Sequence, residues 1–222
     1  MRFARSLRWL CGLLVLPAFL VLAAAWYASG LDFRHSGGDP DATRSALSWM
    51  PDPAPDRHGR ILAVVSSAAR TPDGQHRAGY ELTELSRAWW VFEGAGFSVD
   101  IASPAGGRAP MVLDDDLVDA DFAFLNDPRT RAAYSQTQPL ARIDPDDYVA
   151  VWIVGGKGAM FDLHDNPTLA HIIAAIYDRG GIVAAVCHGP AALLGVRGAD
   201  GTPILAGRRV TGFSNAEERF LM

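Results

Sequence analysis

The sequence predicts an α/β fold in which a doubly wound, mostly parallel sheet is covered by helices on both faces. Three observations lead to this prediction. Short apolar runs alternate with amphipathic segments, a pattern typical of parallel sheets. The runs are too apolar to leave one face in water, so both faces of the sheet are expected to be buried. The chain of 222 residues is long enough for one such domain and an N-terminal extension.

The first part of the domain supplies two strands and one long helix. Residues 61–65 are a continuous apolar run and predict a buried strand. Residues 82–95 predict a helix, because their apolar side chains repeat every three to four positions and glycines follow. Residues 97–102 alternate between apolar and polar, which favours a second strand. The charged segment 114–134, interrupted by Pro128, predicts short helices joined by loops.

The second part of the domain supplies two strands, each of which ends in a turn where functional groups are expected. Residues 148–154 predict a strand that runs into the glycine-rich turn 155–158. Asn166, followed by proline, is typical of a helix N-terminus. The apolar run 181–186 predicts the next strand, which ends at Cys187. Ligands bind beyond the carboxyl ends of parallel strands, so the glycine turn and the cysteine are expected at the same edge.

Composition and cysteine content narrow the classes of function. The formal net charge is −5, and no basic stripe with interleaved aromatic residues exists, which argues against nucleic acid as a partner. The chain has two cysteines, Cys11 and Cys187, without the spacing of a disulfide framework or a zinc site. The cysteine spacing therefore gives no indication of a metal site.

The N-terminal segment has the pattern of a membrane anchor. Three arginines precede an uncharged apolar run over residues 9–27, close to the roughly 20 residues that span a bilayer. We predict an uncleaved transmembrane anchor over residues 1–27, with a cleaved signal peptide, cut near residues 23–25, as the alternative. Residues 28–57 are rich in Gly, Pro, Asp and Ser and predict a flexible stalk. The domain, residues 58–222, is then expected outside the cytoplasm.

Cys187 has the setting of a nucleophile. A strand, a sharp turn and a helix-compatible stretch meet at this residue, as in a nucleophile elbow with cysteine in place of serine. The N-terminus of the following helix is expected to favour the thiolate. His188 comes next in the chain and is a candidate base, while the turn 155–158 offers backbone N–H groups for an oxyanion hole. The alternative is that Cys187 is a small buried hydrophobic residue.

Five segments together resemble one known family. The resemblance is to the DJ-1/PfpI superfamily, which has the class I glutamine amidotransferase-like fold, and within it to the branch of glyoxalase III enzymes and heat-shock chaperones. It extends from about residue 60 to the end of the chain, and Val186-Cys187-His188-Gly189-Pro190 is its most specific part. The segments are residues 78–84, 103–107, 155–163, 184–190 and 211–215.

The resemblance implies a flavodoxin-like fold and a cysteine–histidine–acid site. The cysteine would be the nucleophile, the histidine its partner, one glutamate would approach the sulfur and another would orient the histidine. Carried over by position, the catalytic residues are Cys187, His188, Glu84 and Glu218, and the oxyanion turn contains Gly156 and Gly158.

This chain departs from the family pattern at two places. Lys157 stands where the branch often has histidine. The family's domain also continues beyond the position of Glu218, so the resemblance predicts that C-terminal elements are missing after Met222 and that a site so truncated could be inactive.

The function implied is that of a cofactor-free lyase, glyoxalase III-like or deglycase-like. Cys187 would add to a small reactive carbonyl, a 2-oxoaldehyde such as methylglyoxal, and the product would be a 2-hydroxy acid. Two alternatives stay open: a cysteine peptidase or amidase of the same superfamily, and a membrane-tethered chaperone or redox sensor. Members of the superfamily are often homodimers, but the sequence shows no interface.

Overall fold

The computed structural model describes residues 20–23, 25, 37–51 and 58–221. The chain divides into two compact units, Met1–Ser36 and Gly37–Met222. In the first unit the described residues are helical. The second unit contains the sheet and the candidate site.

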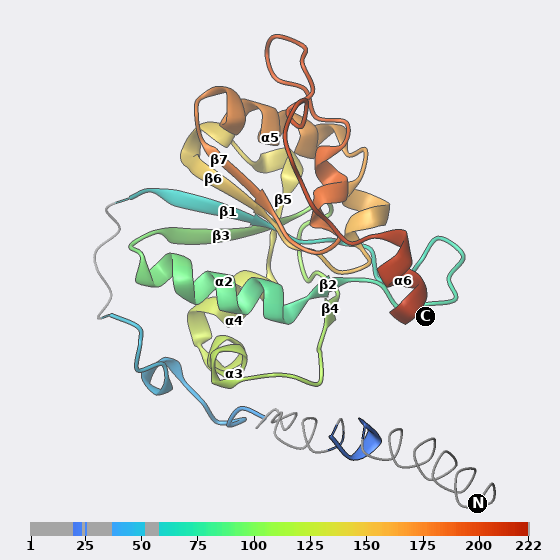
Figure 1. Ribbon diagram of the computed structural model, residues 1–222. Helices are drawn as coiled ribbons and strands as arrows, with labels where there is room; N and C mark the ends of the chain where they lie inside the picture. Colours follow the sequence, from blue (N-terminus) through green and yellow to red (C-terminus); the bar gives the residue numbers. More distant parts are fainter. Residues whose placement is uncertain (1–19, 24, 26–36, 52–57, 222) are drawn as a thin grey trace, which may run out of the picture. The chain divides into compact units, whose positions relative to one another are not determined.

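A five-stranded parallel sheet forms the centre of the second unit, as the sequence predicts (Figure 1). In the strand order β5-β3-β1-β6-β7, the first strand lies in the middle. The chain adds β3 and β5 on one side of it and β6 and β7 on the other. A separate two-stranded parallel pair, β2 and β4, lies beside the carboxyl end of the sheet. The strands are β1 (Arg60–Val64), β2 (Tyr80–Glu81), β3 (Ser98–Ser103), β4 (Met111–Val112), β5 (Gln138–Pro139), β6 (Tyr148–Ile153) and β7 (Ile182–Ala185).

Helices cover both faces of the sheet (Figure 1). One face carries α2 (Leu82–Gly94), α3 (Asp119–Asn126) and α4 (Pro128–Ser135), and the other carries α5 (Pro167–Asp178). The C-terminal helix is α6 (Asn215–Leu221). Short helical turns connect these elements: η1 (Arg44–Ala46), η2 (Leu140–Arg142), η3 (Pro145–Asp147), η4 (Ala159–Leu163) and η5 (Gly189–Leu193).

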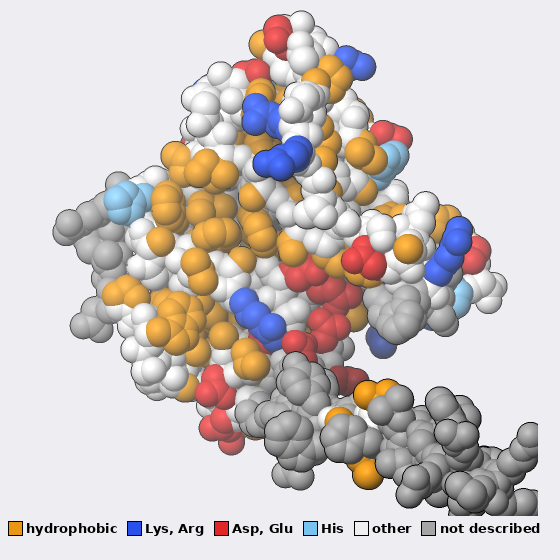
Figure 2. Space-filling model, viewed as in Figure 1, with side chains coloured by type: hydrophobic (Ala, Val, Ile, Leu, Met, Phe, Trp, Pro, Cys, Tyr) orange, Lys and Arg blue, Asp and Glu red, His pale blue; other side chains and the backbone are white. Residues whose placement is uncertain are grey.

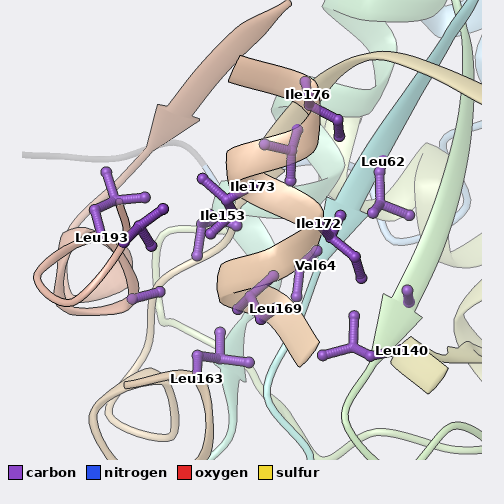
Figure 3. Close-up of a cluster of buried hydrophobic side chains, with 14 of the residues drawn as sticks. Leu62, Val64, Leu140, Ile153, Leu163, Leu169, Ile172, Ile173, Ile176 and Leu193 are labelled. Atoms are coloured by element: carbon purple, nitrogen blue, oxygen red, sulfur yellow. The ribbon is translucent and has the colours of Figure 1, made fainter. Parts of the chain in front are cut away.

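Each helical layer buries its own apolar core against the sheet. Figure 3 shows the core under α5, where Ile172, Ile173 and Ile176 face the sheet residues Leu62 and Ile153. The helix begins as predicted, because the Asn166 side-chain oxygen accepts a hydrogen bond of 3.0 Å from the Leu169 amide. These two packed layers hold the carboxyl ends of β6 and β7 in fixed positions.

The predicted transmembrane anchor over residues 1–27 is wrong, and with it the single-pass membrane location with the domain outside the cytoplasm. Within the described ranges, no helix is both long and apolar enough to cross a bilayer. Residues 1–19, 24 and 26–36, on which most of this prediction fell, lie outside the described residues.

Part of the predicted stalk, residues 37–51, is packed on the domain. Leu47 is 4% exposed and belongs to the apolar core under α2. The Asn126 side chain at the end of α3 donates hydrogen bonds of 2.9 Å to the carbonyls of Pro40 and Ala42. Composition alone suggested a linker, but these long-range contacts supply the burial that the segment cannot provide for itself. Residues 52–57 of the stalk lie outside the described residues.

Candidate active site

The nucleophile candidate lies on a strained corner at the end of β7. Cys187 has φ of 55°, a left-handed conformation that is costly for a residue with a side chain and is found at functional turns. The turn is closed by a 2.7 Å hydrogen bond from the Gly189 amide to the Val186 carbonyl. This is the geometry of a nucleophile elbow. The helix that follows is η5, a 3₁₀ turn of five residues rather than the expected α-helix.

Glu84 is held against the cysteine by a glycine amide from the neighbouring strand end. The carboxylate extends from the first turn of α2, and its Oε2 accepts a 2.7 Å hydrogen bond from the Gly155 amide. The same carboxyl group acts on the Cys187 thiol, because each of the two groups shifts the pKa of the other. A Cβ atom on Gly155 would lie 2.6 Å from Glu84 Oε2 and 2.7 Å from Cys187 Cβ, so only glycine fits between them.

The thiol and the carboxyl group are both shifted toward their protonated forms. Burial and the neighbouring Glu84 carboxylate raise the pKa of Cys187 to about 11. Burial also raises the pKa of Glu84, although its bonds from Gly155 and the thiol act in the opposite direction. Both shifts favour a proton held within the thiol–carboxyl pair. This differs from the thiolate expected from a helix dipole, because the short 3₁₀ turn cannot outweigh burial and a carboxylate in contact.

A histidine, a glutamate and a lysine form a chain on the other side of the sulfur. The Cys187 sulfur lies 3.2 Å from His188 Nδ1, and His188 Nε2 lies 3.0 Å from Glu218 Oε2. The other oxygen of Glu218 forms a 3.0 Å ion pair with Lys157 Nζ. These hydrogen bonds and ion pairs lower the pKa of Glu218, the lysine first and the histidine second. Lys157 therefore supports the acid instead of pointing into solvent.

The imidazole is fixed by stacking and by the local fold. The rings of His188 and Phe213 lie 4.4 Å apart, and the His188 side chain is 8% exposed. The Phe213 amide donates a 3.0 Å hydrogen bond to the Cys187 carbonyl, which ties this segment to the elbow. Ser214 caps α6 by exchanging bonds with Glu217, and so places Glu218 one residue further along.

The two glycines expected in the oxyanion turn differ in what their backbone amides interact with. The Gly156 amide acts on the cysteine and lowers the pKa of its thiol, and its φ of 88° suits glycine. The Gly158 amide instead donates a 3.0 Å bond to the Gly79 carbonyl and so is not free to bind an oxyanion. The second amide at the sulfur is that of His188. The elbow pattern could have indicated this, since the residue after the nucleophile commonly supplies such an N–H.

A cavity of about 700 Å³ opens beside the nucleophile. Cys187, His188 and Phe213 form one end of it, while Val183, Ala185 and Leu193 contribute apolar wall. In the part of the chain that the structure describes, no three His, Cys, Asp or Glu side chains are grouped to hold a metal ion. The cavity is within the size range of sites for small organic molecules.

The fold and this geometry define a class of protein: a parallel α/β domain with a cysteine, a histidine and two acids at the carboxyl ends of its strands. The family model described as DJ-1/PfpI family matches residues 76–220. The chain belongs to the DJ-1/PfpI family, and the resemblance predicted from sequence is confirmed.

Similar proteins come from the glyoxalase III branch. Glyoxalase 3 of Candida albicans is 29% identical over 173 residues, which covers 73% of this chain and 72% of that protein. A glutathione-independent glyoxalase of Schizosaccharomyces pombe, hsp3101, is 31% identical over 173 residues, which covers 72% of this chain and 69% of that protein. The crystal structure of glyoxalase III from Candida albicans superposes with a TM-score of 0.66, at 28% identity, over 73% of this chain and 71% of that one.

Proposed function

We propose that this protein is a cofactor-free glyoxalase that converts a 2-oxoaldehyde such as methylglyoxal into a 2-hydroxy acid. The observation that carries the proposal is the placement of Cys187 on a strained elbow, against the Glu84 carboxyl group and 3.2 Å from His188 Nδ1. Relatives named as glutathione-independent glyoxalases support it.

In the first step the Cys187 sulfur bonds to the aldehyde carbon of the substrate. The thiol proton passes to Glu84, whose raised pKa makes it a better proton acceptor than an ordinary carboxylate. The carbonyl oxygen takes up the proton and becomes the hydroxyl of a hemithioacetal. The amides of Gly156 and His188 lie at the sulfur and are placed to stabilise the negative charge that develops on that oxygen.

In the second step a proton moves from the first carbon of the adduct to the second. Glu84 or His188 removes the proton from the carbon bonded to sulfur, which forms an enediol, and the neighbouring carbon is then protonated. The result is a thioester of the 2-hydroxy acid. Water adds to the thioester carbon, the carbon–sulfur bond breaks and the sulfur regains a proton. The net reaction adds one water to the 2-oxoaldehyde and leaves the enzyme unchanged.

The proposal is tested by measuring lactate formation from methylglyoxal. Cys187→Ser is expected to lose at least about a thousandfold in kcat/KM, because serine is a far weaker nucleophile without a strong base. Cys11→Ser removes the chain's other cysteine and serves as the matched control, with activity expected within twofold of wild type, roughly the error of such a comparison.

Three outcomes contradict the proposal. Unchanged lactate formation in Cys187→Ser would show that Cys187 is not the nucleophile. Cleavage of peptides or amides without turnover of 2-oxoaldehydes would favour a peptidase or amidase. Suppression of client aggregation by a protein that turns over neither substrate would favour a chaperone.

A further inference from the structure

The cavity beside Cys187 is much larger than a substrate such as methylglyoxal requires. Methylglyoxal has five non-hydrogen atoms and fills the space of a few water molecules, each of which takes about 30 Å³ in the liquid. The cavity holds about 700 Å³, within the range of sites for molecules several times larger. Most of the cavity therefore lies beyond the reacting carbons of so small a substrate, and its lining can select the remainder of a longer one.

One face of β7 forms the floor of this cavity. Every second residue along this part of the chain lines it: Gly181, Val183, Ala185 and Cys187. Alternate residues of a strand point to the same face, so these four form one row that ends at the nucleophile. The row from Gly181 to Ala185 is roughly 13 Å long, at ~3.3 Å per residue. Its residues before the cysteine are glycine, valine and alanine, so the floor is apolar.

An arginine lies at the other end of the cavity. The Arg208 guanidinium lies over the ring of Tyr177, 5.6 Å from its centre, and its Nη2 donates a 2.7 Å hydrogen bond to the Tyr177 hydroxyl. Its Nε donates a 2.9 Å bond to the Ile204 carbonyl. Tyr177 is next to last in α5, and the chain turns from there into β7. Arg208 is therefore held near the start of β7, whereas Cys187 follows its end.

The chain from residue 208 to residue 213 joins the two ends of the cavity. The Phe213 amide donates a 3.0 Å hydrogen bond to the Cys187 carbonyl, which fixes one end of this segment beside the nucleophile. The bond from Arg208 to Tyr177 fixes the other end. Residues 208 and 210–213 line the cavity, so the segment runs along it from the arginine to the nucleophile.

The charge of the lining is positive. Arg208 lines the cavity, whereas no Asp or Glu of the described chain does. In the part of the chain that the structure describes, Arg208 forms no ion pair with a carboxylate, and its hydrogen bonds go to the neutral oxygens of Tyr177 and Ile204. Figure 2 shows Lys and Arg side chains beside hydrophobic ones over β7 and α5. A cation at one end of an apolar surface is complementary to an anion that carries an apolar chain.

We propose that the site takes 2-oxoaldehydes with a long apolar substituent that ends in a carboxylate, and that Arg208 selects this carboxylate. The reacting aldehyde carbon lies at Cys187, the chain lies on the floor formed by β7, and the distant carboxylate binds Arg208. A planar guanidinium can hold a carboxylate through two parallel hydrogen bonds, so the arginine recognises both charge and shape. The inference rests on the proposed function for the reacting group, but the binding of the chain and its anionic end can be tested without turnover.

The binding experiment uses decanoate, 1-decanol and acetate as unreactive probes on the full chain. Each probe is added at increasing concentration, and alkylation of Cys187 by iodoacetamide is followed on its own peptide. Decanoate is expected to protect Cys187 at concentrations at least about tenfold below those of decanol, the weight of one charge-assisted hydrogen bond, and acetate is expected not to protect at these concentrations. In Arg208→Gln this preference for decanoate over decanol should be lost. Arg209→Gln is the matched control, because Arg209 is exposed but does not line the cavity, and it should keep the preference.

The rate experiment compares methylglyoxal with a ten-carbon 2-oxoaldehyde that ends in a carboxylate, and with the methyl ester of that compound. The carboxylate substrate should exceed methylglyoxal in kcat/KM by at least about tenfold, since each buried methylene contributes ~fourfold. Arg208→Gln should lower the preference for the carboxylate over the ester by about tenfold, through KM, and Arg209→Gln should not change it.

Two results would overturn this inference. One is a wild type that decanoate does not protect, or protects no better than decanol does. The other is an equal preference for the carboxylate probe in the wild type and in a folded Arg208→Gln protein. A wild type that turns over no 2-oxoaldehyde contradicts the proposed function instead, and the protection by decanoate then still decides whether the cavity binds a chain with an anionic end.

Discussion

Replacement of Gly155 by alanine tests how closely the thiol and the carboxylate are fitted together. The added methyl group would lie 2.6 Å from Glu84 Oε2, 2.7 Å from Cys187 Cβ and 2.7 Å from the Val186 carbonyl oxygen. The Cys187 Cβ atom and the Val186 carbonyl oxygen are held in place by the backbone, so the Glu84 side chain must move. It then loses its 2.7 Å bond from the Gly155 amide. A hydrogen bond to a charged group contributes about 1.5–3 kcal/mol.

That loss converts into a rate effect. At 1.36 kcal/mol for each factor of ten, Gly155→Ala should lower kcat/KM for methylglyoxal by about ten- to a hundredfold. The assay is lactate formation, with thermal unfolding measured in parallel to show that the variant is folded. Gly195→Ala is the matched control, because a Cβ atom there meets nothing closer than 3.6 Å. Activity within twofold of wild type in a folded Gly155→Ala protein would refute the argument that Glu84 must be held at this position.

Three further predictions concern the site and the packed N-terminal segment. Glu84→Gln should have opposite effects on two assays. Without the carboxylate the pKa of Cys187 falls from about 11, so alkylation of Cys187 at pH 8 becomes faster, while lactate formation drops by roughly a hundredfold or more. Slower alkylation would contradict this prediction. The pKa of Glu218 is lowered, so its carboxylate stays charged and bonded to the imidazole at pH values below the ordinary range, and this bond is lost only as the pH falls through the lowered value. Glu218→Gln should remove that acid limb from the rate profile. Leu47→Ala should lower the free energy of unfolding, measured in urea, by about 2–5 kcal/mol, because Leu47 is buried. The Trp49 side chain is 55% exposed, so Trp49→Ala should lower it by about 0.5 kcal/mol or less. Equal effects of the two substitutions would contradict packing of this segment.

The sequence was sufficient for the fold because the relevant signals are local. Apolar runs, the Asn166 cap and the break at Cys187 each depend on a few neighbouring residues, and β1, β6, β7 and α5 lie close to where these patterns place them. The observed order of the strands is one of the few that the connection rules for parallel sheets allow.

The parts that the sequence did not predict all depend on distant residues. The Gly158 amide is occupied by Gly79, which is far away in the chain. The ion pair of Lys157 with Glu218 likewise joins two turns that only the fold brings together. The pattern around Cys187 suggested a thiolate because a helix N-terminus can be predicted from neighbouring residues, whereas burial of the sulfur, which raises the pKa of the thiol, depends on residues that only the fold brings around it.

The raised pKa of the Cys187 thiol bears on which chemistry the site suits. In cysteine peptidases of the papain type the thiol pKa is held at about 3–4, so that a thiolate is ready to attack an amide. Here burial and Glu84 raise the pKa of Cys187 to about 11, even though His188 Nδ1 lies 3.2 Å from the sulfur. An amide requires a strong nucleophile, because attack gives a high-energy tetrahedral intermediate. An aldehyde accepts a thiol readily if a base takes the proton as the sulfur–carbon bond forms. A redox sensor, in turn, needs a low-pKa thiol to react with oxidants. The thiol–carboxyl pair therefore favours addition to a reactive carbonyl over amide cleavage and over redox sensing.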